Sequence, residues 1–257
     1  MMHQDATEQF LNSLPEIKEG ESFRFACHPA VQCFNACCGD LTLQLTPYDV
    51  LRLRRGLNLS SKDFIEGLAE VLVAPDTGFP ALKLRMSEKM HHPCHFVRES
   101  GCSVYENRPG ACRTYPVGRA AKMGENGQIV EQFFLVRESH CKGFKENKEW
   151  TIDEWFSDQG LEPYNESNDR WIQIMARQKQ AGGSIDAKKA TMVLMAVYQV
   201  DNFQRFVHDM QLFKRLDVDE ARQKTILEDE EAALKFAMDW VELVIFGQCD
   251  NLARTEG

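Results

Sequence analysis

The chain has 257 residues, of which 43% are hydrophobic, and it contains 16 Phe and 4 Trp. This length and composition can build a sizeable core, which excludes a disordered chain. The formal net charge of −9 lies wholly in residues 149–257, because residues 1–148 carry 18 basic and 18 acidic side chains. Neither part is basic, which excludes a general nucleic-acid surface. No apolar run approaches the roughly 18 residues of a membrane span.

The N-terminal segment, residues 1–22, is polar and lacks the basic and apolar regions of a signal peptide. We expect a lead-in there, with a short helix around 8–14. A cysteine-rich domain is expected over 23–148, and a helical domain over 149–257. We predict a cytoplasmic protein with no membrane and no nucleic-acid partner.

Period-two alternation of apolar and polar residues predicts short strands at 41–45 and 82–86. A further strand is expected at 132–137, after a loop tip at 124–127. These short strands favour small sheets rather than one large sheet.

Two helix-start patterns lie between the first two strands. The run T-P-Y-D from Thr46 predicts a helix over 47–55 that ends at Gly56. The run S-S-K-D from Ser60 predicts a second helix, with an apolar stripe that continues to Leu72. From Trp150 onward, helical patterns dominate. A capping pattern stands at 151–154, the run P-Y-N at 163–165 is expected to break the chain, and helices are predicted at 171–181, 185–200, 203–216 and 220–246. The predicted fold class is therefore α+β: a small, irregular cysteine-rich domain with short strands and helices, followed by a mostly helical domain.

Eight of the nine cysteines lie within 115 residues, and only Cys249 lies outside that stretch. The eight candidate metal ligands are Cys27, Cys33, Cys37, Cys38, Cys94, Cys102, Cys112 and Cys141. In a reducing compartment, clustered thiols are more often metal ligands or catalysts than disulfides. Four thiolates suit a tetrahedral zinc ion or an iron–sulfur cluster, so eight would fill two such sites, or one cluster with structural thiols besides. The other interpretation is a set of buried or redox-active free thiols.

The spacing of these cysteines does not name the metal. It reads C-x5-C-x3-C-C in the first segment, without the C-x2-C pair of common zinc sites or the ferredoxin pattern. Adjacent residues rarely bind one tetrahedral ion, so Cys37 and Cys38 could serve two sites, or one of them could be a buried thiol. Each nearby histidine is expected to face solvent or to support a ligand rather than to bind metal; these are His28, His91, His92, His95 and His140.

Two arginines lie on either side of Cys112 in the sequence. Arg108 and Arg113 could face the thiolates or hold an anionic substrate, but we favour a structural role in which they bind local carbonyls. Tyr105 and Tyr115 are expected to be packing or supporting residues, and Cys249 an ordinary thiol.

The chain resembles the YkgJ-type cysteine-cluster family, also called the CxxCxxCC or zinc- or iron-chelating domain family. The resemblance rests on Cys37-Cys38, on T-P-Y-D-V-L-R-L, and most specifically on Y-E-N-R-P-G-A-C-R-T-Y-P. It covers roughly residues 25–145, with the family's C-x2-C-x2-C-C stretched here at Cys27. It implies metal chelation through the cysteines. A related cluster in flagellin lysine N-methylases, thought to use an iron–sulfur cluster, makes an enzyme an alternative.

The function expected from the sequence is a cytoplasmic metal-binding protein that holds zinc or iron through the eight cysteines, with a 4Fe–4S cluster as one form. One alternative is an iron–sulfur enzyme for redox chemistry or protein lysine methyl transfer, although the chain lacks a Gly-rich cofactor loop. A second alternative is a metal-stabilised adaptor whose acidic helices bind a protein partner. No catalytic residue is predicted.

Overall fold

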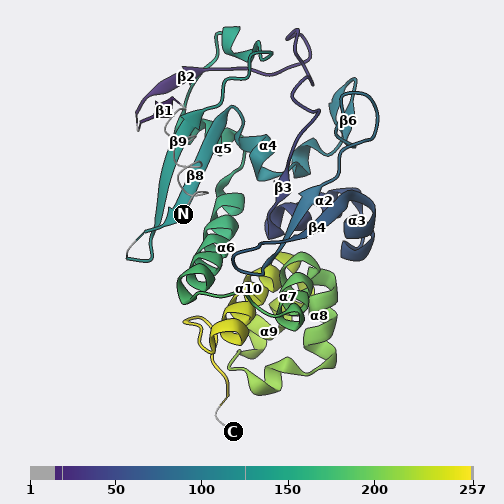
Figure 1. The fold of residues 1–257 in the computed structure, drawn as a ribbon, viewed down its shortest axis with the longest axis vertical. Helices are drawn as coiled ribbons and strands as arrows, with labels where there is room; N and C mark the ends of the chain where they lie inside the picture. The colour runs from purple at the N-terminus through teal and green to yellow at the C-terminus, as the bar shows by residue number, and fades with distance from the viewer. Residues whose placement is uncertain (1–14, 19, 125, 256–257) are drawn as a thin grey trace. The chain divides into compact units, whose positions relative to one another are not determined.

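The computed structural model describes residues 15–18, 20–124 and 126–255 (Figure 1). The helix expected at 8–14 lies outside these residues. The chain forms two compact units, each built from two segments of the sequence. The first unit holds Met86–Asn165 with the described residues up to Leu41, and the second holds Thr42–Arg85 with the described residues from Glu166. The expected sequence domains at 23–148 and 149–257 stay a prediction.

The first unit contains three small antiparallel sheets. A three-stranded sheet has the order β1-β9-β8, and two pairs join β10 to β2 and β6 to β7. The strands are β1 (Glu16–Ile17), β2 (Ser22–Arg24), β6 (Val97–Arg98), β7 (Gly101–Cys102), β8 (Val117–Met123), β9 (Ile129–Leu135) and β10 (Glu149–Thr151). The helices are η1 (Tyr105–Asn107), α4 (Gly110–Thr114), η2 (Gly143–Lys145), α5 (Ile152–Asp158) and the start of α6 (Glu162–Ala181).

Aromatic side chains form the core of the first unit. Trp155 meets Phe25 edge-on at 5.7 Å and Trp150 at 5.1 Å between ring centroids. Both indole N–H groups are satisfied, because Trp150 donates to the carbonyl of Phe25 and Trp155 to that of Thr114, each at 2.9 Å. Cys141 packs against this cluster, which gives the last of the eight cysteines a fixed support.

The second unit is mostly helical, with one antiparallel sheet of order β3-β5-β4. Its strands are β3 (Gln44–Leu45), β4 (Ala69–Val73) and β5 (Pro80–Leu84). Its helices are α2 (Pro47–Leu57), α3 (Ser61–Leu68), the rest of α6, α7 (Ala187–Val193), a π-helical turn η3 (Leu194–Tyr198), α8 (Val200–Asp209), η4 (Leu212–Arg215), α9 (Glu220–Glu228) and α10 (Glu230–Phe246). The α+β prediction is confirmed.

Two capped helix starts are where the sequence predicts them, whereas the helix predicted from 171 begins at Glu162. Thr46 and Asp49 form a reciprocal capping box at α2, and Thr151 and Glu154 form another at α5. The helix ends are less well predicted. Helix α2 continues through Gly56 to a left-handed cap at Asn58, so the expected end at Gly56 is wrong.

Three other expected elements are also corrected. Helix α3 ends at Leu68, and the expected stripe to Leu72 is instead strand β4, which pairs with β5 through all five residues. The run at 163–165 does not break the chain, because it lies in the first turn of α6, where proline is tolerated. The helix expected at 220–246 is two helices, since the Asp229 side chain caps α10 by accepting from the N–H of Ala232.

No helix within the described ranges is long and apolar enough to cross a lipid bilayer.

Candidate metal centre

All eight clustered cysteines lie in the first unit, although the second unit's Thr42–Arg85 separates them into two groups along the chain. All nine cysteines of the chain are free thiols. Cys27 and Cys112 are exposed, and the other six of the cluster are partly buried. The first cysteine segment runs from Cys27 to Cys38 and the second from Cys94 to Cys112, and backbone contacts join the two.

The first cysteine segment is a series of tight turns rather than a helix. The N–H groups of Val31, Phe34 and Ala36 each donate to the carbonyl three residues earlier. Cys33 and Cys37 therefore do not lie on one helical face. Asn35 adopts φ 69°, a left-handed conformation that asparagine tolerates better than most residues. Its side-chain amide donates to the carbonyl of Arg98 at 2.8 Å, which fixes this turn to the β6–β7 hairpin.

The second cysteine segment lies directly against the end of the first. The N–H of Cys94 donates to the carbonyl of Cys38 at 2.7 Å, and the N–H of Asp40 donates to that of His92 at 3.0 Å. Glycine is needed between these contacts, because a Cβ at Gly39 would stand 2.9 Å from the carbonyl oxygen of His91. The two segments therefore meet through the backbone.

Cys102 follows Cys94 on a short hairpin. It lies in β7 opposite Val97 of β6, and the N–H of Ser103 donates to the carbonyl of Phe96 at 2.8 Å. The hairpin turns at Gly101, whose φ of 120° is open to glycine and strained for other residues. This tight connection returns the chain toward Cys94, whose thiol is affected by the charge of Cys102.

Cys112 lies on the short helix α4, which two buried arginines hold in place. Arg113 donates to the carbonyls of Gln159 at 2.6 Å and Arg108 at 3.3 Å, and it also contacts the carbonyl of Glu106. Arg108 donates to the carbonyl of Tyr105 at 2.6 Å and to the Gln159 side chain. The structural role predicted for these arginines is confirmed by these contacts. Tyr105 lies under the Arg108 guanidinium, 3.7 Å from the ring centroid.

Cys141 is brought to the first segment by two backbone contacts. The N–H of the next residue, Lys142, donates to the sulfur of Cys33 at 3.0 Å. The N–H of Ala26 donates to the carbonyl of Gly143 at 3.2 Å. A Cβ at Gly143 would lie 2.7 Å from the carbonyl oxygen of Ala26, so the approach requires glycine. The Lys142 contact was not predictable from side-chain patterns, because its donor is the backbone.

Four of the thiols form what we call the first thiol group: Cys27, Cys33, Cys37 and Cys141. Cys27 keeps an exposed surface, yet the surrounding protein partly desolvates its sulfur. This desolvation raises the pKa of Cys27 to about 11, and repulsion from the other three thiols adds to the increase. The sulfurs of Cys33, Cys37 and Cys141 are therefore near enough to Cys27 for their charges to act on it.

The other four form the second thiol group: Cys38, Cys94, Cys102 and Cys112. Burial raises the pKa of Cys94, and repulsion from Cys102 contributes while the Arg98 guanidinium opposes the rise. The thiols of Cys112 and Cys94 repel a thiolate at Cys38. Burial lowers the pKa of Arg108, and its attraction to Cys112 and Cys102 opposes that change. The second thiol group therefore has cations beside it.

Cys37 and Cys38 connect the two groups through a hydrogen bond between their thiols. This bond lowers the pKa of Cys37, the acceptor, to about 7 and raises the pKa of Cys38, the donor. Glu138 acts in the opposite direction on Cys37.

A tyrosine hydroxyl faces the first thiol group. The buried Tyr115 hydroxyl has no hydrogen bond of normal geometry among the described residues, and the group beside it is the Cys141 thiol. Burial raises the pKa of Tyr115, and Cys141 raises it further, so this hydroxyl is a donor at neutral pH. A buried hydroxyl donor without a hydrogen-bond acceptor is unusual in a folded protein. A thiolate at Cys141 would accept its hydrogen bond.

The five nearby histidines are all exposed. His28 faces Glu146 at 3.4 Å, and His92 contacts the carbonyl of Ser87 at 3.1 Å. These contacts match the expectation that the histidines lie at the surface.

The thiols lie in one compact unit, but their side chains are not arranged as a closed coordination site. In the part of the chain that the structure describes, no set of three or more His, Cys, Asp or Glu side chains is placed to hold one ion. The chemistry of the donors nevertheless fits zinc or iron, because both are held by thiolates in sets of four. Tyr115 supports the same fit.

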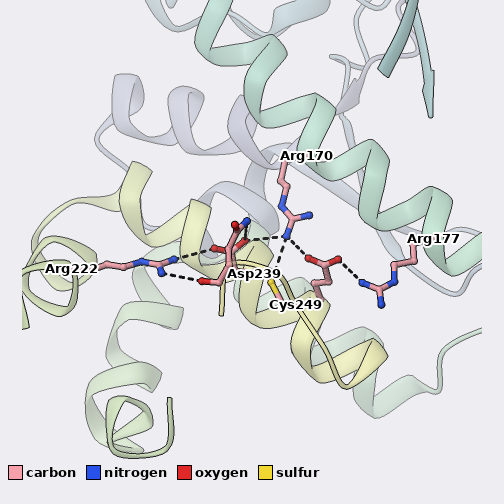
Figure 2. A network of polar contacts seen from close by, with 7 residues as sticks. Arg170, Arg177, Arg222, Asp239 and Cys249 are labelled. Atoms are coloured by element: carbon pink, nitrogen blue, oxygen red, sulfur yellow. Dashed lines mark hydrogen bonds and ion pairs between the residues drawn. The ribbon is translucent and has the colours of Figure 1, made fainter. Parts of the chain in front are cut away.

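The second unit contains a separate polar cluster, built on two buried acids of helix α10. Figure 2 shows Asp239 between Arg222 and Arg170, which donate to it at 3.1 and 3.0 Å. Glu242 contacts Arg170 and accepts from Arg177 at 2.6 Å. The sequence analysis missed this cluster, although acids three residues apart within an apolar helix were a visible signal.

A cavity of about 730 Å³ adjoins this cluster, lined by α6, α9 and α10 with Asn251. None of its lining residues is a cysteine. Cys249 lies near the cluster, where its sulfur is 3.8 Å from a nitrogen of Arg170.

Comparison with known proteins gives one match. A family model described as "CxxCxxCC: Putative zinc- or iron-chelating domain" matches residues 26–150, which include all eight clustered cysteines. Neither the comparison with curated proteins nor the comparison with solved structures gives a match.

Proposed function

Because residues 26–150 form a domain of the CxxCxxCC family, we propose that the protein binds zinc or iron through its clustered thiols. The proposed ligands are Cys27, Cys33, Cys37, Cys38, Cys94, Cys102, Cys112 and Cys141. The observation that carries the proposal is the meeting of sequence-distant cysteine segments in one compact unit, through contacts such as Cys94 to Cys38 and Lys142 to Cys33. Eight soft donors in one place suit zinc or an iron–sulfur cluster better than calcium or magnesium, which prefer oxygen.

The protein's own groups would hold the thiolate charge. The N–H of Lys142 donates to the Cys33 sulfur, and the Tyr115 hydroxyl would donate to a thiolate at Cys141. The guanidinium of Arg108 attracts thiolates at Cys102 and Cys112. When bound, zinc would cross-link the loop segments, and a 4Fe–4S cluster would add electron transfer. We propose a cytoplasmic location, since free clustered thiols need a reducing compartment.

Neither the enzyme alternative nor the adaptor alternative is supported by a specific contact among the described residues. The cavity beside Asp239 is lined without any cysteine, so it gives no support to chemistry at the thiols.

One preparation tests the proposal. The full chain is purified without oxygen, and its metal content, acid-labile sulfide and visible spectrum are measured. Brown protein with sulfide indicates an iron–sulfur cluster, and colourless protein with zinc indicates zinc sites. Protein that contains neither metal and takes up neither after reconstitution contradicts the proposal.

Variants identify the ligands. Cys112→Ser and Cys37→Ser are expected to lose metal and thermal stability, whereas Cys249→Ser is the matched control and is expected to lose neither. Equal metal content in all three variants would contradict the ligand assignment.

A further inference from the structure

The cavity beside Asp239 lies wholly within the second unit and is independent of the thiols. We infer that this cavity of about 730 Å³ binds a small organic anion, and that Arg170 and Arg222 hold the carboxylate or phosphate group of that ligand. A cavity of this volume suits a ligand of the size of a metabolite.

The buried carboxylate of Asp239 positions the two arginines at the cavity wall. Its side chain is 9% exposed, and Figure 2 shows it between Arg170 and Arg222. One carboxylate oxygen accepts from Arg170 at 3.0 Å, and the other accepts from Arg222 at 3.1 Å. Arg222 also donates to the backbone carbonyl of Asn251 at 3.1 Å. Guanidinium groups from two different helices are therefore fixed beside the cavity before a ligand enters, which lowers the cost of binding.

Arg170 keeps most of its hydrogen-bonding capacity. Its contacts with Asp239, Glu242 and Cys249 all leave from Nη2, and its Nε and Nη1 have no partner among the residues that the structure describes. Arg113 in the first unit differs, because its Nε, Nη1 and Nη2 each donate to a carbonyl. The protein thus saturates Arg113 but leaves two nitrogens of Arg170, which can donate to the oxygens of a carboxylate or phosphate.

The acids of the cavity lining already have partners, and this sets the charge of the ligand. Both oxygens of Asp239 accept from arginines, and Glu166 accepts from Lys235 at 2.8 Å. Asp169, the third acid of the lining, has interactions of its own. The ammonium group of Lys235 has three donors, and it is exposed. The lining therefore offers donors beyond those that its acids use, which favours an anion.

Another part of the cavity lining is apolar. Ile226, Phe236 and Met238 belong to the lining, and their side chains are almost fully buried. Contact between such side chains and the carbon atoms of a ligand is favourable, because it removes apolar surface from water. An organic anion with an apolar part therefore fits the lining better than a bare inorganic ion.

Isothermal titration calorimetry of the full chain at constant ionic strength tests the site. Phthalate and phenyl phosphate are the probes, because each joins an apolar ring to an anionic group, and uncharged phthalamide is the matched control. The anions are expected to bind at one site with a Kd below about 1 mM, and phthalamide at least about tenfold more weakly. Binding of one anion alone supports the inference and identifies the preferred group. No saturable binding of either anion up to about 10 mM, or equal binding of phthalamide, overturns it.

Two arginine variants locate the bound anion. Arg170→Gln should weaken binding of the probes by at least about tenfold. Arg177→Gln is the matched control and should bind them as the wild type does, because Arg177 contacts the same Glu242 but does not line the cavity. Equal affinities in the two variants overturn the inference.

A third variant changes no charge. Thr225 lines the cavity from an exposed position on α9, so Thr225→Trp fills space in the cavity without burying a new side chain in the core. This variant should also weaken binding by at least about tenfold. Wild-type affinity in Thr225→Trp would place the anion elsewhere and overturn the inference. If Arg170→Gln does not fold by circular dichroism, Thr225→Trp decides the question.

Discussion

The backbone N–H of Lys142 donates a 3.0 Å hydrogen bond to the thiol sulfur of Cys33, across 109 residues of sequence. Because a hydrogen bond is directional, it fixes the position of this sulfur relative to the segment after Cys141. It is also independent of the side chain at position 142, so Lys142→Ala preserves it. The path of the chain thus sets the position of the Cys33 sulfur.

Metal affinity is expected to rise steeply with pH. The pKa of Cys27 is raised to about 11, and the pKa values of Cys38 and Cys94 are also raised, so metal must displace protons from these thiols. We expect apparent affinity to increase by more than about tenfold per pH unit between about pH 6 and 8, because more than one proton is released per ion. Competition with a chromogenic chelator at several pH values measures this. A flat profile would contradict thiol ligation.

Arg113→Lys is expected to lower the free energy of unfolding by about 3 kcal/mol. Arg113 is buried and serves three carbonyls, on Glu106, Arg108 and Gln159, which a lysine cannot satisfy together. Urea unfolding measures the change. Lys122→Ala, at an exposed position of β8, is the control and should stay within about 0.5 kcal/mol of wild type. A small effect of Arg113→Lys would show that α4 does not depend on this side chain.

Glu242→Gln is expected to destabilise the protein by about 2 kcal/mol at neutral pH. Burial opposes ionisation of Glu242, but Arg170 and Arg177 outweigh it and lower its pKa below the ordinary 4.5. A lowered pKa gives stability above the ordinary value and loses it as pH falls through the lowered one. The difference between wild type and variant should therefore shrink below about pH 4.5.

The control for this prediction lies between the same two helices. Glu166 of α6 pairs with Lys235 of α10 at 2.8 Å, but both side chains are well exposed. Glu166→Gln should cost no more than about 1 kcal/mol, because solvent screens exposed pairs. Equal losses in the two variants would mean that burial does not strengthen the Glu242 contacts.

Tyr115→Phe is expected to have opposite effects with and without metal. Without metal, it removes a buried hydroxyl that lacks a normal hydrogen bond, so stability should stay equal or rise by up to about 1 kcal/mol. With metal, the hydroxyl would donate to the Cys141 thiolate, and its loss should lower the melting temperature and speed the release of metal to a chelator. Thermal melts before and after metal removal measure both effects. The same shift in both forms would contradict a role for Tyr115 beside Cys141.

The sequence predicted the two helix starts that carry capping boxes better than the ends of α2 and α3. Capping patterns at Thr46 and Thr151 are local, because side chain and backbone three residues apart satisfy each other. The end of α3 depends on a distant partner. Residues of β4 read as a helical stripe, but pairing with β5 supplies backbone hydrogen bonds that a longer helix would forgo.

The residues of the candidate site were predictable from the sequence, but their division into two thiol groups was not. Eight clustered cysteines and the structural role of Arg108 and Arg113 follow from sequence and resemblance. The division into two thiol groups does not, because it depends on backbone contacts such as the one from Lys142 to Cys33. The Asp239 and Glu242 cluster was missed since its arginine partners come from separate helices.

The chain leaves the first unit after Leu41 and returns at Met86, and the flanking residues are fastened by the Cys94 to Cys38 bond and by a bridge between Gly39 and Pro93. The two ends of the segment between them are therefore held close together, whatever the length of that segment. A search for relatives should allow a free gap between Cys38 and Cys94. The number of residues between Cys94 and Cys102 should vary little among relatives, because a short hairpin sets the distance between these two cysteines.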